Sequence, residues 1–322
     1  MASPNAAGIY LKILLGVLVC CLVLHLMSLV PPPLAASWVP SRISAAARVG
    51  SYSTSSSAVE GITHSSDLSS SSGLWLLATM SPASAQRRRN IIRTTWQSMY
   101  NNEAFTMRFV ISNPGEKWAG LVRHENDTYH DIIMLPNLKE TAHVANTIKT
   151  MEFFTQLVAA TSSSGQTWNY VSKIDDDSFL DTTAFYRDFI LPRPHANATI
   201  IARDMSRFSS KAYSYPGGQF YTLTWDLVVT LAQLYAQNTI NNEAEDVLVG
   251  RLLYEGGQPW DLVKLDNARA FDYDKSISDT SKWAHKVTPD SVNPHKMKTD
   301  EVYLDVAGQM AALQRTNSSE TG

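Results

Sequence analysis

The sequence is poor in cysteine and has no excess of basic residues. Its two cysteines, Cys20 and Cys21, are adjacent, and such a pair cannot build a disulfide framework or a four-ligand zinc site. The 27 Lys and Arg residues are outnumbered by 30 Asp and Glu residues, which gives a formal net charge of −3. Because nucleic-acid-binding proteins usually present a basic surface, this balance argues against a nucleic-acid partner.

The sequence also lacks repeats of solenoid period, and it is too apolar for a disordered chain. Hydrophobic residues make up 44% of its 322 residues, and charged residues make up 18%. A chain of this composition folds around a core, and its length allows one large domain or two medium ones.

A long uncharged run lies near the N-terminus. Residues 13–30 read ILLGVLVCCLVLHLMSLV, which approaches the roughly 20 residues that an α-helix needs to cross a bilayer. Three prolines at 31–33 then end the helix. We therefore expect a transmembrane signal anchor at 13–30, preceded by a short cytoplasmic tail at 1–12. A cleaved signal peptide is the alternative, although its apolar core is usually shorter, about 7–15 residues.

A segment of low complexity follows the apolar run. Residues 31–72 are rich in Ser, Ala and Pro and offer too little apolar surface to fold, so we expect a flexible stem. Three N-glycosylation sequons lie downstream, at Asn126, Asn197 and Asn317. Together these features predict a single-pass type II membrane protein whose C-terminal part faces the lumen of the secretory pathway.

From Gly73 onward, short apolar runs alternate with helical patterns. The spacing of Val144, Ile148 and Met151 predicts one of the helices, and Asp181 is placed to cap another at its N-terminus. The predicted strands are 73–79, 106–112, 131–135 and 169–174, and the predicted helices are 85–100, 115–126, 141–160 and 181–191.

This alternation predicts an α/β fold with a mostly parallel central sheet and helices on both of its faces. We expect one globular domain at 73–313, followed by a disordered tail at 314–322. In such sheets ligands bind beyond the carboxyl ends of the strands. The residues directly after the strand at 169–174 are therefore the first place to look for a site.

Three consecutive carboxylates, Asp175, Asp176 and Asp177, follow that strand. Their clustering is costly unless a cation compensates the charge, and Mg²⁺ or Mn²⁺ is the natural choice for oxygen ligands. In extended chain Asp175 and Asp177 point to one side and Asp176 to the other. A solvated acidic turn that caps the next helix is the alternative interpretation.

A second acidic pair, Glu245 and Asp246, precedes the apolar run VLVGRLLY. It is either a helix N-terminus stabilised by negative charge or a site where a carboxylate acts as general base in a cleft. Between the two acidic motifs, in residues 212–225, Gly217 and Gly218 are flanked by Tyr213, Tyr215, Phe220 and Tyr221. This pattern predicts a flexible, aromatic-walled loop suited to sugar rings, with a core turn as the alternative.

Four motifs match a known family in order and spacing. RRRNIIRTTW, YVSKIDDDSF, YPGGQFYTLTWDLV and EDVLVG resemble those of the β-1,3-galactosyltransferase family, glycosyltransferase family 31. The segments LWLLATMSPASAQRRRNIIRTTW and VANTIKT are similar to further parts of that family's pattern. The resemblance spans roughly residues 74–310, nearly everything after the expected stem.

The resemblance implies a GT-A fold, a UDP-sugar donor, Mn²⁺ or another divalent cation, and inversion at the anomeric carbon. It implies that Asp246 is the catalytic base, that Glu245 supports it, and that Asp177 is the direct metal ligand. For Arg88 and Arg93 a structural role in helix packing stays open. The further donor-binding and metal-binding residues that the resemblance implies are Asp175, Asp176, Lys173, Arg88, Arg93, Gly218 and Tyr221.

Members of this family often place a late histidine on the metal. Here the resemblance favours His295, with His285 as the alternative, and a surface position is the ordinary interpretation of either histidine alone. The sequence departs from the family pattern in MLPNLKE after the third strand, in Gln97 where a glycine is common, and in having no cysteine after Cys21. These departures bear on the acceptor more than on the donor chemistry.

The predicted function is the transfer of galactose from UDP-galactose to a hydroxyl of a glycan acceptor, with a β-1,3 linkage, at the Golgi membrane. Three alternatives stay open: a transferase that uses UDP-N-acetylglucosamine, a lectin-like homologue without activity, and a metal-dependent phosphohydrolase. The sequence leaves the acceptor glycan and the oligomeric state undetermined.

Overall fold

The computed structural model describes residues 75–100, 105–164, 168–205, 210–277 and 284–320. The chain divides into two units, Met1–Thr54 and Ser55–Gly322, and all described residues belong to the second unit. The predicted anchor at 13–30 and the predicted stem at 31–72 lie outside the described residues. No helix within the described ranges has the length and apolar character needed to cross a membrane.

A seven-stranded sheet forms the centre of the described part, in the order β3-β2-β1-β4-β6-β5-β7. Strands β3, β2, β1 and β4 are parallel, β6 is antiparallel to both of its neighbours, and β5 is parallel to β7. The predicted α/β class with a mostly parallel sheet is confirmed. The strands are β1 (Trp75–Met80), β2 (Phe105–Asn113), β3 (Ile132–Lys139), β4 (Tyr170–Asp175), β5 (Thr199–Asp204), β6 (Pro216–Thr224) and β7 (Asp261–Leu265).

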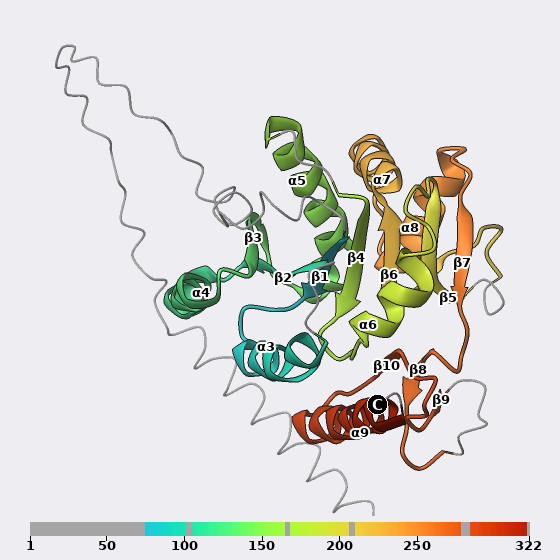
Figure 1. Ribbon diagram of the computed structural model, residues 1–322. Coiled ribbons are helices and arrows are strands. Elements are labelled where there is room, and N and C mark those ends of the chain that lie inside the picture. Colours follow the sequence, from blue (N-terminus) through green and yellow to red (C-terminus); the bar gives the residue numbers. More distant parts are fainter. Residues whose placement is uncertain (1–74, 101–104, 165–167, 206–209, 278–283, 321–322) are drawn as a thin grey trace, which may run out of the picture. The chain divides into compact units, whose positions relative to one another are not determined.

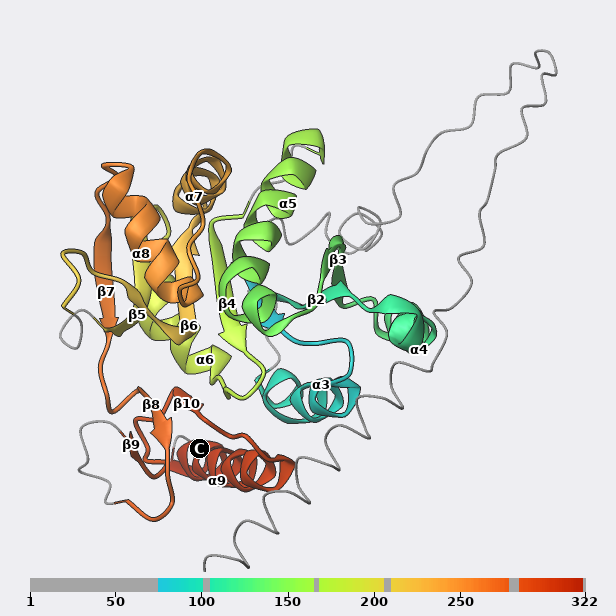
Figure 2. The same cartoon turned by 180° about the vertical axis from the view of Figure 1, so that it is seen from behind.

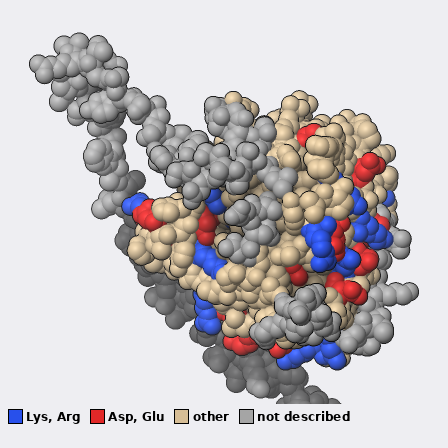
Figure 3. All heavy atoms as spheres, in the orientation of Figure 1, with Lys and Arg blue, Asp and Glu red and all other residues tan. Residues whose placement is uncertain are grey.

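Helices cover both faces of this sheet, as Figures 1 and 2 show from opposite sides. One face carries α5 (Lys149–Ser164), α7 (Trp225–Gln237) and α8 (Glu245–Glu255). The other face carries α3 (Gln86–Ile92), α4 (Gly115–Tyr129), α6 (Thr182–Phe185) and α9 (Asp300–Glu320). Acidic and basic side chains lie interspersed over the face drawn in Figure 3.

Each face of the sheet has its own hydrophobic core, because successive strand side chains point to opposite faces. In β1, Trp75 and Leu77 pack with residues of α3, α6 and α9. Leu76 and Ala78 pack with residues of α5, α7 and α8. All four side chains are at most 1% exposed. The continuous apolar sequence of β1 is therefore explained by burial on both sides.

Three of the predicted helices consist of an α-helix and a π-helical turn. The turns are η2 (Arg93–Gln97), η3 (Val144–Ile148) and η4 (Tyr186–Ile190). The predicted cap is confirmed, because the carboxylate of Asp181 accepts a hydrogen bond of 2.8 Å from the backbone N–H of Ala184.

A smaller parallel sheet lies next to the last helix (Figure 1). It contains β8 (Ala270–Tyr273), β9 (Ala284–His285) and β10 (Asn293–His295), in the order β10-β8-β9. Helix α9 then runs to Glu320, so it continues into the segment for which a tail at 314–322 was expected.

The structure corrects the prediction of a flexible loop at 212–225. Most of this segment is β6, which pairs with β4 on one side and β5 on the other. Phe220 and Tyr221 are fully buried and belong to the core, whereas Tyr213 and Tyr215 are partly exposed. A Cβ on Gly217 would lie only 3.1 Å from the Cβ of Arg203 on the neighbouring strand. The glycine thus permits close strand packing rather than flexibility.

Candidate functional site

The carboxyl ends of β1 and β4 meet the beginning of β6 at one edge of the large sheet. Met80 pairs with Asp175 where the two parallel strands end, and the antiparallel β6 begins at Pro216 beside them. Ligands of open α/β sheets bind beyond this kind of edge. Two cavities, of 640 and 530 Å³, are found here.

The larger cavity is bounded by β6, the start of α8 and β10, and we call it the α8 cavity. The smaller one is bounded by α3, the start of α5 and the turn after β4, and we call it the α3 cavity. Ala145, Asn146 and Asp175 line both, so the two cavities adjoin at the end of β4. The α8 cavity contains Asp246, and the α3 cavity contains Asp177.

The side chains of the three aspartates at the end of β4 point to different sides, as the strand alternation predicts. Asp175, Asp177 and His295 offer ligand atoms that all lie within 4.8 Å of one another. Asp176 instead accepts a hydrogen bond of 3.3 Å from the hydroxyl of Ser81. Burial, together with the two neighbouring carboxylates, raises the pKa of Asp176 to about 6.

Backbone hydrogen bonds bring His295 to the acidic motif. The N–H of Phe179 donates to the carbonyl of Pro294 at 2.9 Å, and the N–H of Met297 donates to the carbonyl of Asp177 at 3.1 Å. These bonds hold β10 and the turn after it against the turn after β4. The histidine therefore meets carboxylates that are far away in the sequence.

The ring of His295 is oriented by Asp272. Its Nδ1 lies 2.9 Å from a carboxylate oxygen of Asp272, and because a carboxylate only accepts, Nδ1 is the donor. The Nε2 then faces Asp177 at 3.4 Å and Asp175 at 4.0 Å. Such a carboxylate behind the distant ring nitrogen is common where a histidine binds metal. Burial lowers the pKa of His295, but Asp177 and Asp272 outweigh it and raise the pKa.

The chemistry of these side chains fits a divalent cation. Asp175 and Asp177 supply hard oxygen ligands and His295 supplies an imidazole, a set suited to Mn²⁺. Burial opposes ionisation of Asp177, but His295 and Lys298 hold the pKa of its carboxyl well below the usual range. Asp177 is therefore ionised at neutral pH, as a metal ligand must be.

Glu245 and Asp246 form the first turn of α8, as one of the two interpretations of the sequence predicts. Both carboxylate oxygens of Glu245 have partners: one lies 2.6 Å from the ammonium of Lys173, and the other accepts a hydrogen bond of 2.7 Å from Tyr221. Burial raises the pKa of Glu245 to about 7, with the charge of Lys173 opposing. Glu245 lines the α8 cavity together with Asp246, but both of its carboxylate oxygens are already engaged by protein groups.

Asp246 lines the α8 cavity. One carboxylate oxygen accepts a hydrogen bond of 3.1 Å from the N–H of Gly218, and the other accepts one of 2.8 Å from the N–H of Val247. Burial raises the pKa of Asp246, which makes this carboxylate a better proton acceptor. A Cβ on Gly218 would lie 3.0 Å from the carboxylate, so the glycine permits this close contact.

A buried lysine connects the two acidic motifs. The ammonium of Lys173 lies 2.7 Å from Asp175 and 2.6 Å from Glu245, and it also contacts the carbonyl oxygen of Gly218. Burial lowers the pKa of Lys173, but the two carboxylates raise it well above its ordinary value. One charge therefore fixes the end of β4 relative to the start of α8.

The structure places the two predicted arginines in different surroundings, and only Arg88 lines a cavity of the site. Arg88 lines the α3 cavity and donates a hydrogen bond of 2.8 Å to the carbonyl of Met297. Arg93 forms ion pairs of 2.8 Å with Glu125 and with Asp131 instead, and it is not among the residues that line the two cavities. For Arg93 the structural alternative holds, because these two acids turn its side chain away from the site.

Two further predicted residues lie away from the cavities. Tyr221 is fully buried, because β6 directs its side chain into the core under α8, and it contacts Glu245 rather than a substrate. The alternative metal ligand His285 is buried, and its two ring nitrogens lie 2.6 Å from the carbonyl oxygens of Lys286 and Asn267. His285 therefore has a structural role, whereas His295 lies beside the acids.

Residues 87–206 match the galactosyltransferase family model. This segment of the chain is similar to a galactosyltransferase domain. The predicted family resemblance and the predicted enzyme class, a glycosyltransferase, are confirmed by this match. No sequence match is found among curated proteins.

The chain is similar in structure to several glycosyltransferases at low sequence identity. The galactosyltransferase LgtC, in complex with donor and acceptor sugar analogues, aligns over 73% of this chain and 95% of its own, at 10% identity and a TM-score of 0.41. A glycosyltransferase involved in glycosylation of the major capsid of PBCV-1 aligns over 74% and 98%, at 11% identity and a TM-score of 0.39. Mouse xyloside xylosyltransferase 1 aligns over 70% and 97%, at 10% identity and a TM-score of 0.35.

Several residues of the site are absent from the sequence prediction. Asp272 orients His295, Lys298 contacts Asp177, and Lys296 forms an ion pair of 2.7 Å with Asp272. Arg203 lines the α8 cavity and lies 3.6 Å from Asp272. The two lysines follow His295 in the motif HKMK, which indicates a basic segment. No spacing in the sequence points to Asp272 or Arg203.

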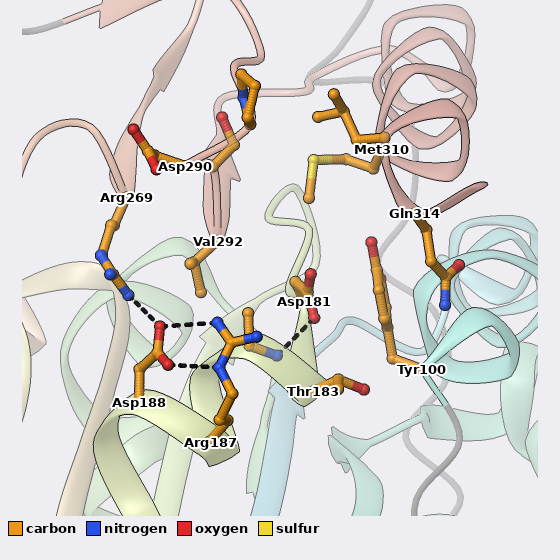
Figure 4. A pocket seen from close by; sticks show the side chains of 14 residues that line it. Tyr100, Asp181, Thr183, Arg187, Asp188, Arg269, Asp290, Val292, Met310 and Gln314 are labelled. Atoms are coloured by element: carbon orange, nitrogen blue, oxygen red, sulfur yellow. Dashed lines mark hydrogen bonds and ion pairs between the residues drawn. The ribbon is translucent and has the colours of Figure 1, made fainter. Parts of the chain in front are cut away.

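A third cavity of the described chain, of 360 Å³, lies between α6, η4, α9 and the approach to β10. In Figure 4, Arg187 and Arg269 both point toward Asp188, which accepts hydrogen bonds of 2.6 and 2.5 Å from them. Val292 lines this cavity, whereas His295 lines the α8 cavity. None of the site residues predicted from the sequence lines it.

Proposed function

We propose that the chain is a divalent-cation-dependent galactosyltransferase that moves galactose from UDP-galactose to a hydroxyl of a glycan acceptor. One observation carries this proposal: the cluster of Asp175, Asp177 and His295 lies where two cavities adjoin, and Asp246 lines the second of them. A donor and an acceptor can therefore meet at the end of β4. The match of residues 87–206 to the galactosyltransferase family supports galactose as the transferred sugar.

In this proposal the diphosphate of the donor lies at the α3 cavity. Asp175, Asp177 and His295 would hold the cation, and Asp272 and Lys173 keep two of these ligands in place. When bound, the cation supplies Lewis-acid stabilisation of the departing UDP. Arg88 adds a positive charge to the same cavity and, through Met297, fixes the turn that follows His295.

The acceptor occupies the α8 cavity, where Asp246 takes the proton from its attacking hydroxyl. The N–H of Gly218 orients the carboxylate. The hydroxyl oxygen then bonds to the anomeric carbon as the bond to UDP breaks, with inversion and, as the sequence resemblance implies, a β-1,3 linkage. Glu245 is a positioning residue, since Lys173 and Tyr221 occupy its two oxygens.

We also propose a location at the Golgi membrane, as a single-pass type II protein. This rests on the uncharged run at 13–30, the segment at 31–72 and the three sequons. Protease protection of the full-length chain in intact microsomes, with glycosidase treatment, tests it. A chain that is cut from the cytoplasmic side and carries no glycan would contradict the proposed topology.

The reaction is tested with the full-length chain, Mn²⁺, a panel of UDP-sugars and a panel of glycan acceptors, followed by linkage analysis of the product. We expect transfer of galactose. Transfer of N-acetylglucosamine instead would change the assigned donor. Release of phosphate from the UDP-sugar without transfer would identify a phosphohydrolase, and binding of UDP without any reaction would identify a non-catalytic homologue.

The variant Asp177→Asn tests the cation site. We expect it to lose Mn²⁺-dependent binding of UDP, measured by calorimetry, because an amide is a far weaker ligand than a carboxylate. Asp290→Asn is the matched control, since Asp290 is exposed and lines the third cavity rather than these two. Unchanged UDP binding in Asp177→Asn would remove this residue from the site.

A further inference from the structure

Lys298 contacts the carboxylate that the proposed cation would need. Its ammonium lies against one oxygen of Asp177, while His295 faces the other oxygen at 3.4 Å. The side chain of Lys298 is 74% exposed and lines the α3 cavity, next to Arg88. The ammonium of Lys298 is thus paired with Asp177, while the aliphatic part of the side chain is exposed to solvent.

The backbone that carries Lys298 is held in place. The N–H of Met297 is bonded to Asp177, and Arg88 donates to the carbonyl of Met297. Lys296 has a φ of 67°, a left-handed conformation that is unfavourable for residues other than glycine and is kept where the surroundings enforce it. Its side chain forms an ion pair of 2.7 Å with Asp272. The backbone of the turn is therefore anchored by several contacts, whereas the side chain of Lys298 is largely exposed.

We propose that Lys298 is an exchangeable counter-ion, which neutralises Asp177 in the absence of a cation and moves to the phosphate oxygens of a nucleoside diphosphate when a cation engages Asp177. The reason is electrostatic. An ammonium and a divalent cation repel each other at one carboxylate, whereas a diphosphate in the α3 cavity adds negative charge within reach of a flexible lysine stem. This inference rests on the proposed function.

The exchange predicts effects of opposite sign when the charge of Lys298 is removed. Binding of Mn²⁺ without nucleotide should tighten by about two- to fivefold, because the competing ion pair is an exposed one of modest strength. Binding of UDP at saturating Mn²⁺ should weaken by about tenfold, because a charge-assisted hydrogen bond to phosphate is lost. A lysine with only a structural role would shift both affinities in the same direction.

The experiment compares the full-length wild-type chain with Lys298→Met and Lys298→Arg. Free Mn²⁺ is followed by electron paramagnetic resonance, and UDP binding at saturating Mn²⁺ is followed by calorimetry. Lys286→Met is the matched control, since Lys286 is exposed and lines neither cavity. We expect Lys298→Arg to retain UDP binding near the wild-type value, and Lys286→Met to change neither affinity.

Two results would overturn the inference while leaving the proposed function in place. Lys298→Met could match the wild type in both affinities, or it could weaken both while Lys298→Arg restores them together. A wild-type chain that binds neither Mn²⁺ nor UDP would instead overturn the proposed function, and the inference with it.

Discussion

Glu245 and Asp246 are neighbours in the chain but meet different surroundings. Both residues line the α8 cavity, but the carboxylate of Glu245 is engaged by Lys173 and Tyr221, whereas that of Asp246 accepts hydrogen bonds from backbone N–H groups. Of the two acids, Asp246 is thus the one that can accept a proton from a substrate hydroxyl.

Replacing this carboxylate tests its role. Asp246→Asn should lower turnover by about 100- to 10,000-fold, the usual contribution of a general base. Binding of Mn²⁺ and UDP should stay near the wild-type value, because the substitution preserves the shape of the side chain and lies outside the cation cluster. Steady-state kinetics and calorimetry give the two readouts. Full turnover in this variant would place the base elsewhere.

The pH dependence of the reaction follows from the pKa of Asp246. The base acts in its deprotonated form, so kcat/KM should fall as the pH drops through this pKa. Burial raises the pKa, so the fall should begin at a higher pH than for an ordinary aspartate, whose pKa is about 3.9. A pH profile of kcat/KM checks this. A rate that stays constant down to about that ordinary value would be inconsistent with a buried aspartate as base.

Arg89 and Glu125 form a buried ion pair that lines neither of the two cavities. Arg89 and Glu125 are 0% and 1% exposed and lie 2.6 Å apart, so Glu125→Gln leaves an uncompensated charge and should cost about 3 kcal/mol of unfolding free energy. Burial opposes ionisation of Glu125, but Arg89 and Arg93 lower its pKa. The stabilisation is therefore complete above the unfolded-state pKa of about 4.3 and is lost as the pH falls through the lower folded-state value.

Urea unfolding at neutral and acidic pH measures both effects. Glu116→Gln is the matched control, since Glu116 is exposed on the same helix, and it should change stability by less than about 1 kcal/mol. Equal losses of unfolding free energy in the two variants would mean that the effect of Glu125→Gln does not come from burial of the ion pair.

At the scale of elements, the position of α8 depends on a glycine. A Cβ on Gly250 would lie 2.6 Å from the Cβ of Tyr215 and would also clash with the carbonyl oxygen of Ser214. Gly250→Ala should therefore destabilise the fold by about 1–3 kcal/mol and lower turnover, because the helix that carries Asp246 must shift.

Gly120→Ala is the control for this substitution. Gly120 is also helical, but a Cβ there meets no atom within 4 Å. Since alanine is the better helix former, this variant should gain about 0.5–1 kcal/mol. Thermal unfolding measures the stability of both variants. A Gly250→Ala variant as stable as the wild type would show that α8 can shift without cost.

The element with the least accurate prediction was β6. The four strands and four helices predicted between residues 73 and 191 are all present, because each is a long apolar run or a helical pattern. The pair of glycines at 217–218 favoured a loop instead. In the structure these glycines let β5 and Asp246 approach the strand, a reason that depends on neighbours distant in the sequence.

For the whole molecule, the two cavities join parts of the chain that are far apart. The α3 cavity takes residues from α3, α5, β4 and the turn before α9. A ligand that binds only the folded chain stabilises it by about 2.7 kcal/mol at a hundred times its Kd. Mn²⁺ and UDP together should therefore raise the Tm of the wild type, measured by calorimetry. An equal rise in Asp177→Asn would contradict binding through that residue.

The sequence by itself determined the alternation of strands and helices, the acidic motif at the end of β4, the cap at Asp181 and the acids that begin α8. These features depend on near neighbours, whose chemistry and periodicity are written along the chain. Only the tertiary structure decided between His295 and His285, separated Arg88 from Arg93 and placed Asp272 and Lys298. These positions depend on contacts between segments that meet only when β10 and α9 pack against the sheet.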